Sequence, residues 1–145
     1  MILALDTNVL LFYVNRDCPE HSRVTRFIHR HAAAGNRLAV PWRVLYEFLR
    51  LITHPSVVQR PMTAAQGHVV ISRLLMRPEI ALLGPTDMHA QYLESTIKEL
   101  PDLAGNLFYD VEIAVALREH GIQDIATLDR DFYRFEFLRV VNPFG

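Results

Sequence analysis

The 145-residue sequence has a single cysteine, Cys18, and a single lysine, Lys98. A disulfide framework needs paired cysteines and is therefore excluded, and a lone thiol beside Pro19 with no obvious base is typical of an inert side chain. No apolar stretch reaches the ~18 residues that a membrane-spanning helix requires, and the first residues have neither a basic region nor a small-residue cleavage site. We therefore expect a cytoplasmic protein with neither a signal peptide nor a membrane span.

The rest of the composition is that of a folded globular protein. Hydrophobic residues make up 50% of the chain and charged residues 21%, which is typical of folded rather than disordered proteins. A chain of this length can bury about 70% of its unfolded surface. Because we find no internal repeat, low-complexity tract or linker, we expect residues 1–145 to form a single domain.

The net charge of −1 conceals an uneven distribution of charge along the chain. Residues 16–60 contain eight arginines and three acids, whereas residues 79–136 contain twelve acids and four basic residues. Arginine supplies fourteen of the fifteen basic residues, and its planar guanidinium suits phosphates and carboxylates. Arg23, Arg26 and Arg30 have helical spacing and form either an ordinary solvated face or a surface for a nucleic acid or protein partner.

Short apolar runs of strand length alternate with helical patterns. We expect strands at residues 3–5, 38–40, 80–83, 125–127 and 138–141, and helices from about residue 9 and at residues 21–34, 42–52, 63–76, 87–100 and 107–120. The sequence Thr63-Ala-Ala-Gln predicts a capping box, and Asp87 is predicted to cap the following helix. The alternation predicts an α/β fold, a three-layer α/β/α sandwich around a central, mostly parallel sheet of about five strands.

The opening segment MILALDTNVLL places three polar residues between two apolar runs. The first run ends a buried strand and the second has helical spacing, so Asp6, Thr7 and Asn8 form a strand-to-helix turn. Two interpretations are open. Either Thr7 or Asn8 caps the helix while Asp6 lies favourably at its positive end, or Asp6 is a metal-binding carboxylate at a sheet edge. The second interpretation requires further acids at that edge.

Three other acids occupy positions that suit such an edge. Asp129 closely follows the expected strand at residues 125–127, and the carboxyl ends of parallel strands gather ligand-binding loops. Glu47 and Asp110 lie on expected helices among apolar neighbours, although acids are rarely buried without a partner. Together with Asp6 they predict a cluster of carboxylates at one edge of the sheet.

Four stretches, in order and spacing, resemble PIN domains, in particular the VapC-type ribonuclease toxins of bacterial type II toxin–antitoxin pairs. They are D-T-N-V-L, V-L-Y-E-F-L-R, N-L-F-Y-D-V-E-I-A-V-A-L-R-E-H-G and T-L-D-R-D-F. The resemblance also includes the closing L-R-V-V-N-P and is weakest between residues 56 and 96. It implies an acidic catalytic quartet of Asp6, Glu47, Asp110 and Asp129, supported by Thr7, Asn8, Thr127 and Asp131.

The resemblance implies a Mg²⁺-dependent endoribonuclease, with Mn²⁺ as a substitute. Mg²⁺ prefers oxygen ligands and retains waters, so a few carboxylates from distant segments can hold it over a phosphate. We expect Asp6 and Asp110 to be direct ligands, Asp129 a third or water-mediated ligand, and Glu47 a ligand or a base that orients water. The implied partners are an RNA substrate, a cognate antitoxin protein and a second copy of the chain in a homodimer.

One position departs from the resemblance. Glu112 follows Asp110 by two residues, where many relatives have a non-acidic residue. On a helix this spacing should turn Glu112 away from Asp110. We expect a surface role for Glu112, and an indirect contribution to the site stays open.

Other enzymes with an acid after the first strand fit the sequence less well. Phosphatases of the haloacid-dehalogenase kind need Asp-x-Asp, but position 8 is Asn8. Receiver domains need a lysine late in the chain, and the only lysine is Lys98. A catalytically silent binding module, which keeps the PIN fold and acts only through a protein or nucleic-acid partner, remains the serious alternative.

Overall fold

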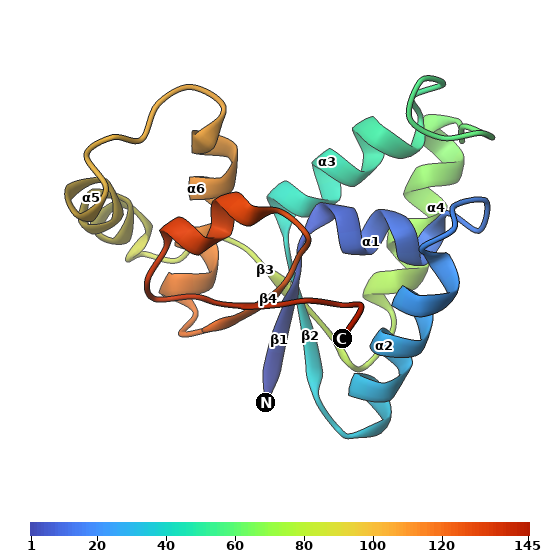
Figure 1. Ribbon diagram of the computed structural model, residues 1–145, viewed down its shortest axis with the longest axis horizontal. Coiled ribbons are helices and arrows are strands. Elements are labelled where there is room, and N and C mark those ends of the chain that lie inside the picture. Colours follow the sequence, from blue (N-terminus) through green and yellow to red (C-terminus); the bar gives the residue numbers. More distant parts are fainter.

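The computed structural model describes every residue from Met1 to Gly145 and has a central five-stranded sheet (Figure 1). The strands are β1 (Ile2–Leu5), β2 (Arg37–Pro41), β3 (Ile80–Leu83), β4 (Asp124–Ala126) and β5 (Arg139–Val141). They lie in the order β3-β2-β1-β4-β5, and every neighbouring pair is parallel. The predicted parallel sheet is therefore confirmed, and the expected strand ends differ from the observed ones by a single residue at most.

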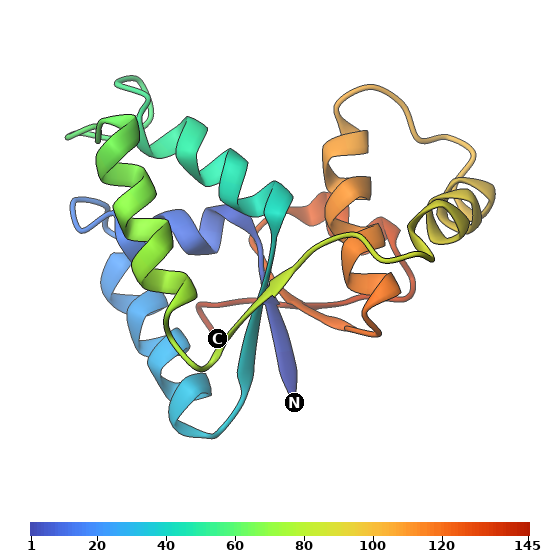
Figure 2. The same ribbon diagram turned by 180° about the vertical axis from the view of Figure 1, so that it is seen from behind.

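Six α-helices and one 3₁₀ helix surround the sheet. They are α1 (Thr7–Val14), α2 (His21–Ala33), α3 (Trp42–Ile52), α4 (Ala64–Leu75), α5 (His89–Glu99), α6 (Leu107–Glu119) and the 3₁₀ helix η1 (Arg130–Arg134). Figures 1 and 2 show α1 to α4 on one side of the sheet and α5 and α6 on the other. Helices therefore cover both faces, as buried parallel strands require.

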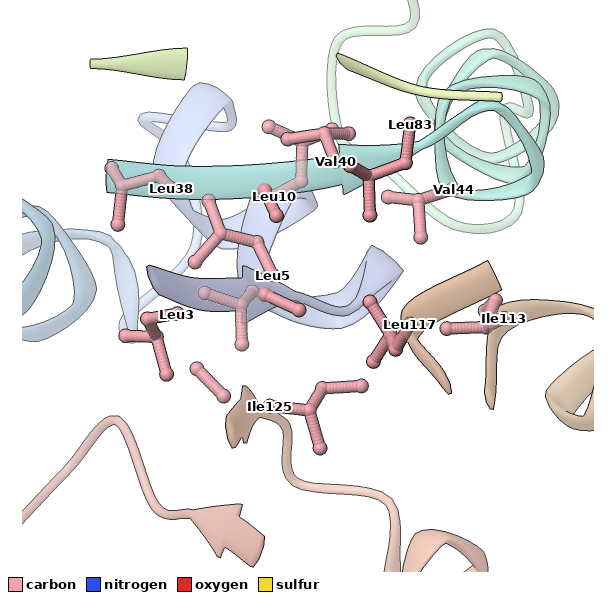
Figure 3. Close-up of a cluster of buried hydrophobic side chains, with 14 of the residues drawn as sticks. Leu3, Leu5, Leu10, Leu38, Val40, Val44, Leu83, Ile113, Leu117 and Ile125 are labelled. Atoms are coloured by element: carbon pink, nitrogen blue, oxygen red, sulfur yellow. The ribbon is translucent and has the colours of Figure 1, made fainter. Parts of the chain in front are cut away.

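The core lies where the central strands meet these two helical layers. Leu3, Leu5 and Leu38 are at most 1% exposed, and Figure 3 shows their side chains beside those of Leu10 and Leu117 from the flanking helices. Burying each large aliphatic side chain stabilises the fold by roughly 1.5–3 kcal/mol. Because β1 and β2 are apolar on both faces, they can only occupy the centre of a covered sheet.

The expected arginine stripe lies on the exposed face of α2. Arg23, Arg26 and Arg30 are exposed, whereas Val24 and Ile28 are buried in the core. The helix is thus amphipathic in the sense that its sequence spacing predicts.

The helix starts agree only in part with the sequence predictions. The Thr63 capping box is confirmed, since Thr63 Oγ1 accepts from the Gln66 amide at 3.1 Å and Gln66 Oε1 accepts from the Thr63 amide at 2.9 Å. The Asp87 cap is wrong: α5 begins at His89 without a side-chain cap. Thr86 instead organises this turn, because its hydroxyl accepts from the Met88 amide at 3.1 Å.

At α1 the cap is Asp6 rather than Thr7 or Asn8. The Asp6 carboxylate accepts a hydrogen bond from the Thr7 amide at 2.7 Å. The prediction that Thr7 or Asn8 caps this helix is therefore wrong. Asp6 is itself the N-cap of α1, and this role is compatible with metal binding because a carboxylate has further lone pairs.

The parallel register brings the ends of distant segments together. β1 pairs with β4 so that Leu5 lies beside Ala126, and the chain therefore leaves both strands at the same edge, at Asp6 and Thr127. The Asp6 amide also donates to the Ala126 carbonyl at 3.0 Å. None of the helices combines the length and apolar character needed to cross a membrane.

Candidate active site

A groove of about 680 Å³ opens at this carboxyl edge of the sheet. Its lining includes the four acids of the expected quartet, namely Asp6, Glu47, Asp110 and Asp129. They come from the β1–α1 turn, α3, α6 and the turn after β4, so four segments distant in sequence meet around one concavity. Thr7 and Asn8 also line the groove.

Asp6 is the most deeply buried of these acids, at 5% exposure. Its carboxylate accepts from the Thr7 amide at 2.7 Å and from Thr127 Oγ1 at 2.6 Å, with Asn8 Nδ2 at 3.3 Å. Burial raises the pKa of Asp6, and the negative charges of Asp129 and Glu47 add to this effect, while the hydrogen bonds from Thr127 and Thr7 oppose it. Asp6 is therefore held in one orientation by its neighbours.

The turn after β4 is fastened to the β1–α1 turn by the residues expected to support the site. Thr127 Oγ1 accepts from the Asp129 amide at 2.9 Å, and Asn8 Nδ2 donates to the same oxygen at 3.3 Å. The Asp129 carboxylate accepts from the Asp131 amide at 2.9 Å and so caps η1. These hydrogen bonds fix the positions of two acids relative to Asp6.

Asp110 lies in the first turn of α6, half-buried and among acids. Burial raises its pKa to about 7, and repulsion from Asp129, Asp6 and Asp131 adds to the shift. None of the ion pairs in the structure involves Asp110. When this carboxyl group ionises, no ion-pair partner in the protein neutralises its charge.

Asp110, Asp129 and Asp131 bring three carboxylates together, and two of them, Asp110 and Asp129, line the groove. One carboxylate oxygen from each lies within 4.8 Å of the others. Oxygen donors at this spacing and partial exposure suit a hard divalent cation. Asp131, which the sequence placed in a supporting role, belongs to this trio but does not line the groove, whereas Asp6 lines the groove but lies outside the trio.

Glu47 differs from the other acids because arginines hold both of its carboxylate oxygens. Arg43 Nη2 lies 3.1 Å from Oε1, and Arg50 Nη2 lies 3.0 Å from Oε2. Sequence analysis missed these two arginines. Their spacing of four residues before and three residues after Glu47 on an expected helix is the signal that would have identified them.

Arg43 also connects the groove to Glu112. Its guanidinium lies 4.2 Å from the centre of the Tyr109 ring, and its Nε is 3.7 Å from the Glu112 carboxylate. Glu112 itself is exposed and does not line the groove. The expected surface position of Glu112 is confirmed, and its contact with the groove is indirect.

Comparisons with known proteins agree with this architecture. The family model of the PIN domain matches residues 3–138. Ribonuclease VapC24 of Mycobacterium tuberculosis is 34% identical over 145 residues, which cover 98% of this chain and 97% of that protein. Ribonuclease VapC37 of the same species is 30% identical over 139 residues, which cover 96% of this chain and 95% of that protein.

Solved structures share the fold at lower identity. VapBC2 from Rickettsia felis, bound to a DNA fragment from its promoter, matches with a TM-score of 0.69 at 18% identity and covers 98% of both chains. The sarcin–ricin loop cleaving toxin VapC20 of Mycobacterium tuberculosis matches with a TM-score of 0.64 at 17% identity, covering 94% of this chain and 96% of that one. The family model and the nearly full-length relatives together show that the chain belongs to the PIN-domain family and, within it, to the VapC-type group.

Proposed function

We propose that this chain is a Mg²⁺-dependent endoribonuclease toxin of a toxin–antitoxin pair, and that residues 1–145 form its single nuclease domain. It would hydrolyse RNA phosphodiester bonds in the acidic groove. The observation that carries the proposal is the convergence of carboxylate oxygens of Asp110, Asp129 and Asp131 within 4.8 Å of one another, beside a groove that Asp6, Asp110 and Asp129 line. The names of the VapC relatives, which are ribonucleases, support the same activity.

The donor set fits a small divalent cation. Asp110, Asp129 and Asp131 would hold Mg²⁺, or Mn²⁺ in its place, with Asp6 and Glu47 as further ligands or as residues that orient water. All donors are carboxylate oxygens, which hard cations prefer. Burial, with added repulsion from Asp129, Asp6 and Asp131, raises the pKa of Asp110 to about 7. When bound, such an ion lowers the pKa of a coordinated water and stabilises negative charge on a phosphate.

Two side-chain roles in the groove can be assigned: Asp6 would be held ready for the substrate, and Asp110 would release a proton when a cation binds. Thr127 and Asn8 hold the Asp6 carboxylate, at 2.6 and 3.3 Å, so that it does not need to reorganise when substrate arrives. Asp110, with a pKa of about 7, releases its proton near neutral pH. Occupation of the groove by a cation should therefore displace a proton from Asp110, and affinity for the cation should rise with pH.

The partners follow from the same assignment. The solved relatives include complexes named VapBC from Rickettsia felis and Salmonella typhimurium, both bound to DNA. We propose that this chain likewise has a cognate antitoxin protein, forms a homodimer and acts on RNA in the cytoplasm. Growth arrest on expression of the chain alone, relieved by Asp110→Asn or by the antitoxin, would be the cellular consequence.

The test is cleavage of single-stranded RNA by the purified protein. We expect cleavage in Mg²⁺ or Mn²⁺, none in EDTA, and loss of activity in Asp6→Asn with an unchanged circular dichroism spectrum. Asn retains the ability to cap α1, so this variant removes charge without removing the cap. Cleavage at the same rate in EDTA would refute the metal mechanism, and a folded protein that never cleaves RNA would favour the silent binding module.

A further inference from the structure

The groove has a wall whose chemistry contrasts with its acidic edge. This wall consists of Arg43, Tyr46 and Arg50 of α3 together with Tyr109 of α6, and all four residues line the groove. We call it the arginine–tyrosine wall. Metal-binding acids need neither large aromatic rings nor guanidinium groups beside them, so the wall requires its own explanation.

Both tyrosine side chains of the wall are exposed to solvent. Tyr46 is 65% exposed and Tyr109 is 53% exposed. Neither hydroxyl takes part in the side-chain hydrogen bonds of the structure, and Tyr46 lies 6.4 Å from Trp42, measured between ring centres, in a tilted arrangement. Exposed rings beside a groove offer flat faces on which a second planar group can stack.

The two arginines are held in place before any ligand arrives. Glu47 accepts from Arg43 at 3.1 Å and from Arg50 at 3.0 Å, so one carboxylate fixes two guanidinium groups. The Arg43 guanidinium also lies over the Tyr109 ring, 4.2 Å from its centre, and this cation–π contact restrains the ring. Within the groove lining, the charges of Arg43, Glu47 and Arg50 sum to a single positive charge. Glu112, whose carboxylate lies 3.7 Å from Arg43 Nε, is exposed and outside the lining.

We infer that the arginine–tyrosine wall binds the nucleotides next to the cleaved bond in single-stranded RNA. The guanidinium groups of Arg43 and Arg50 contact flanking phosphates, and Tyr46 and Tyr109 stack against unpaired bases. This inference rests on the proposed function. It selects single strands because the bases of a duplex already stack on one another and cannot reach a side-chain ring.

The charge distribution supports an RNA ligand for this wall. The acidic edge repels phosphates unless a cation is present, so a substrate needs a second, positively charged anchor in the same groove. Arg43 and Arg50 provide that anchor on α3, and the tyrosines add binding that does not depend on charge. Phosphate contact and base stacking predict different experimental signatures, because only the first depends on salt.

The experiment measures binding of a fluorescein-labelled, random-sequence 12-nucleotide RNA by anisotropy. Ca²⁺ replaces Mg²⁺ so that cleavage is suppressed, and gel electrophoresis verifies the length of the RNA. We compare the wild type with Tyr46→Ala, Tyr109→Ala, Arg43→Ala and Arg50→Ala across a range of salt concentrations. Arg73→Ala and Tyr133→Ala serve as matched controls, since both residues are exposed and outside the groove, and Tyr133 at 66% exposure matches Tyr46.

Each class of variant should change one property. The tyrosine variants should weaken binding about tenfold without changing its salt dependence, as expected for loss of one stacked base. Each arginine variant should reduce the slope of log K against log salt by ~0.7, the value for one lost phosphate contact on a single strand. Both controls should bind as the wild type does, and a duplex of the same length should bind more weakly.

Three results would overturn the inference, and they can be told apart. If the wild type cleaves and binds RNA but the wall variants keep its affinity and salt slope, the inference fails and the proposed function survives. If the wall variants change only the oligomeric mass measured by light scattering, the wall is a protein interface. If the wild type neither binds nor cleaves any RNA, the proposed function itself fails. Circular dichroism of each variant verifies that it is folded.

Discussion

The two ends of α6 carry carboxylates in opposite situations. Asp110, in its first turn, is half-buried among three other acids and has no ion-pair partner, and its pKa rises to about 7. Glu119, in the last turn, has a side chain with 0% exposure, yet its pKa is lowered. Burial alone would raise the Glu119 pKa, but hydrogen bonds from His89 at 2.7 Å and from Thr86 at 2.7 and 2.9 Å outweigh it.

This contrast shows that burial of an acid does not identify a functional site. Glu119 is buried because its donors satisfy it, and it joins α6 to the turn before α5. Asp110 has only other acids as charged neighbours, so its charge is stabilised only when a ligand supplies a positive charge. Asp110 therefore differs from Glu119 because it lacks a hydrogen-bonding or ion-pair partner, rather than because of how deeply it is buried.

Replacing Asp110 or Glu119 should produce its largest difference in the rate of RNA cleavage. Asp110→Asn removes a proposed metal ligand and should lower the rate of RNA cleavage in Mg²⁺ by ~100-fold or more, since even outer-sphere changes cost 10–100-fold. Glu119→Gln removes a structural charge and should leave cleavage by the folded protein within about threefold of the wild type. The measurement is the initial rate on a labelled single-stranded RNA. Equal losses in both variants would mean that the two acids do not differ in role.

The second effect is on stability, and here a change at Glu119 should matter more than a change at Asp110. Glu119→Ala leaves the partly buried donors of Thr86 and His89 without their acceptor and should lower the free energy of unfolding by ~1–3 kcal/mol. For a chain of this size that corresponds to a fall in Tm of several degrees. Asp110→Asn should not destabilise the protein in EDTA at pH 8. Thermal melts followed by circular dichroism decide the matter, and a Glu119→Ala Tm equal to that of the wild type would contradict the structural role.

Sequence analysis predicted the frame of this molecule well because the frame depends on local periodicity. The alternation of apolar runs and helical patterns was sufficient to predict the parallel sheet. Because Asp6 follows β1 and Asp129 follows β4, both acids were predicted at the same edge of the sheet. The same reasoning could not anticipate Glu119. Its donors His89 and Thr86 lie some 30 residues away, and no local pattern connects a helix end to a distant turn.

The predictions for Asp87 and Glu47 failed to identify which side chains form the hydrogen bonds and ion pairs at those positions. Asp87 is of a residue type that often caps helices, but it does not cap α5. Thr86 organises this turn instead, because its hydroxyl donates to Glu119 and accepts from the Met88 amide. Glu47 was expected as a metal ligand or a base that orients water, and its ion pairs with Arg43 and Arg50 were not anticipated. Such choices depend on three-dimensional proximity, and sequence spacing indicates them only within a single helix.

The third effect concerns pH. The pKa of Asp110 is about 7 in the folded protein against an ordinary value of 3.8, so ionisation of Asp110 opposes folding. As pH rises from 4 to 7 the unfolded chain loses this proton first, and the metal-free protein is progressively destabilised. Asp110→Asn escapes this loss. Its Tm advantage over the wild type in EDTA should be larger at pH 8 than at pH 5, and an advantage that does not change with pH would contradict the assignment.

The smallest effect should be that of Asp129→Asn in EDTA. Asn can still accept the hydrogen bond from the Asp131 amide that caps η1, so the change removes charge and keeps the cap. The Tm should equal or slightly exceed that of the wild type in EDTA, and the upward shift on adding Mn²⁺ should shrink. The exposed variant Arg73→Ala is the control. A lower Tm with an unchanged Mn²⁺ shift would remove Asp129 from the proposed metal site.

The most direct test of the contrast is a calorimetric titration of the protein with Mn²⁺ at pH 6 and at pH 8. We expect the wild type to bind more tightly at pH 8, because a bound cation displaces the proton of Asp110. Asp110→Asn should bind weakly and with little dependence on pH, and Glu119→Gln should bind as the wild type does. Equal Mn²⁺ affinity in wild type and Asp110→Asn at both pH values would contradict the account.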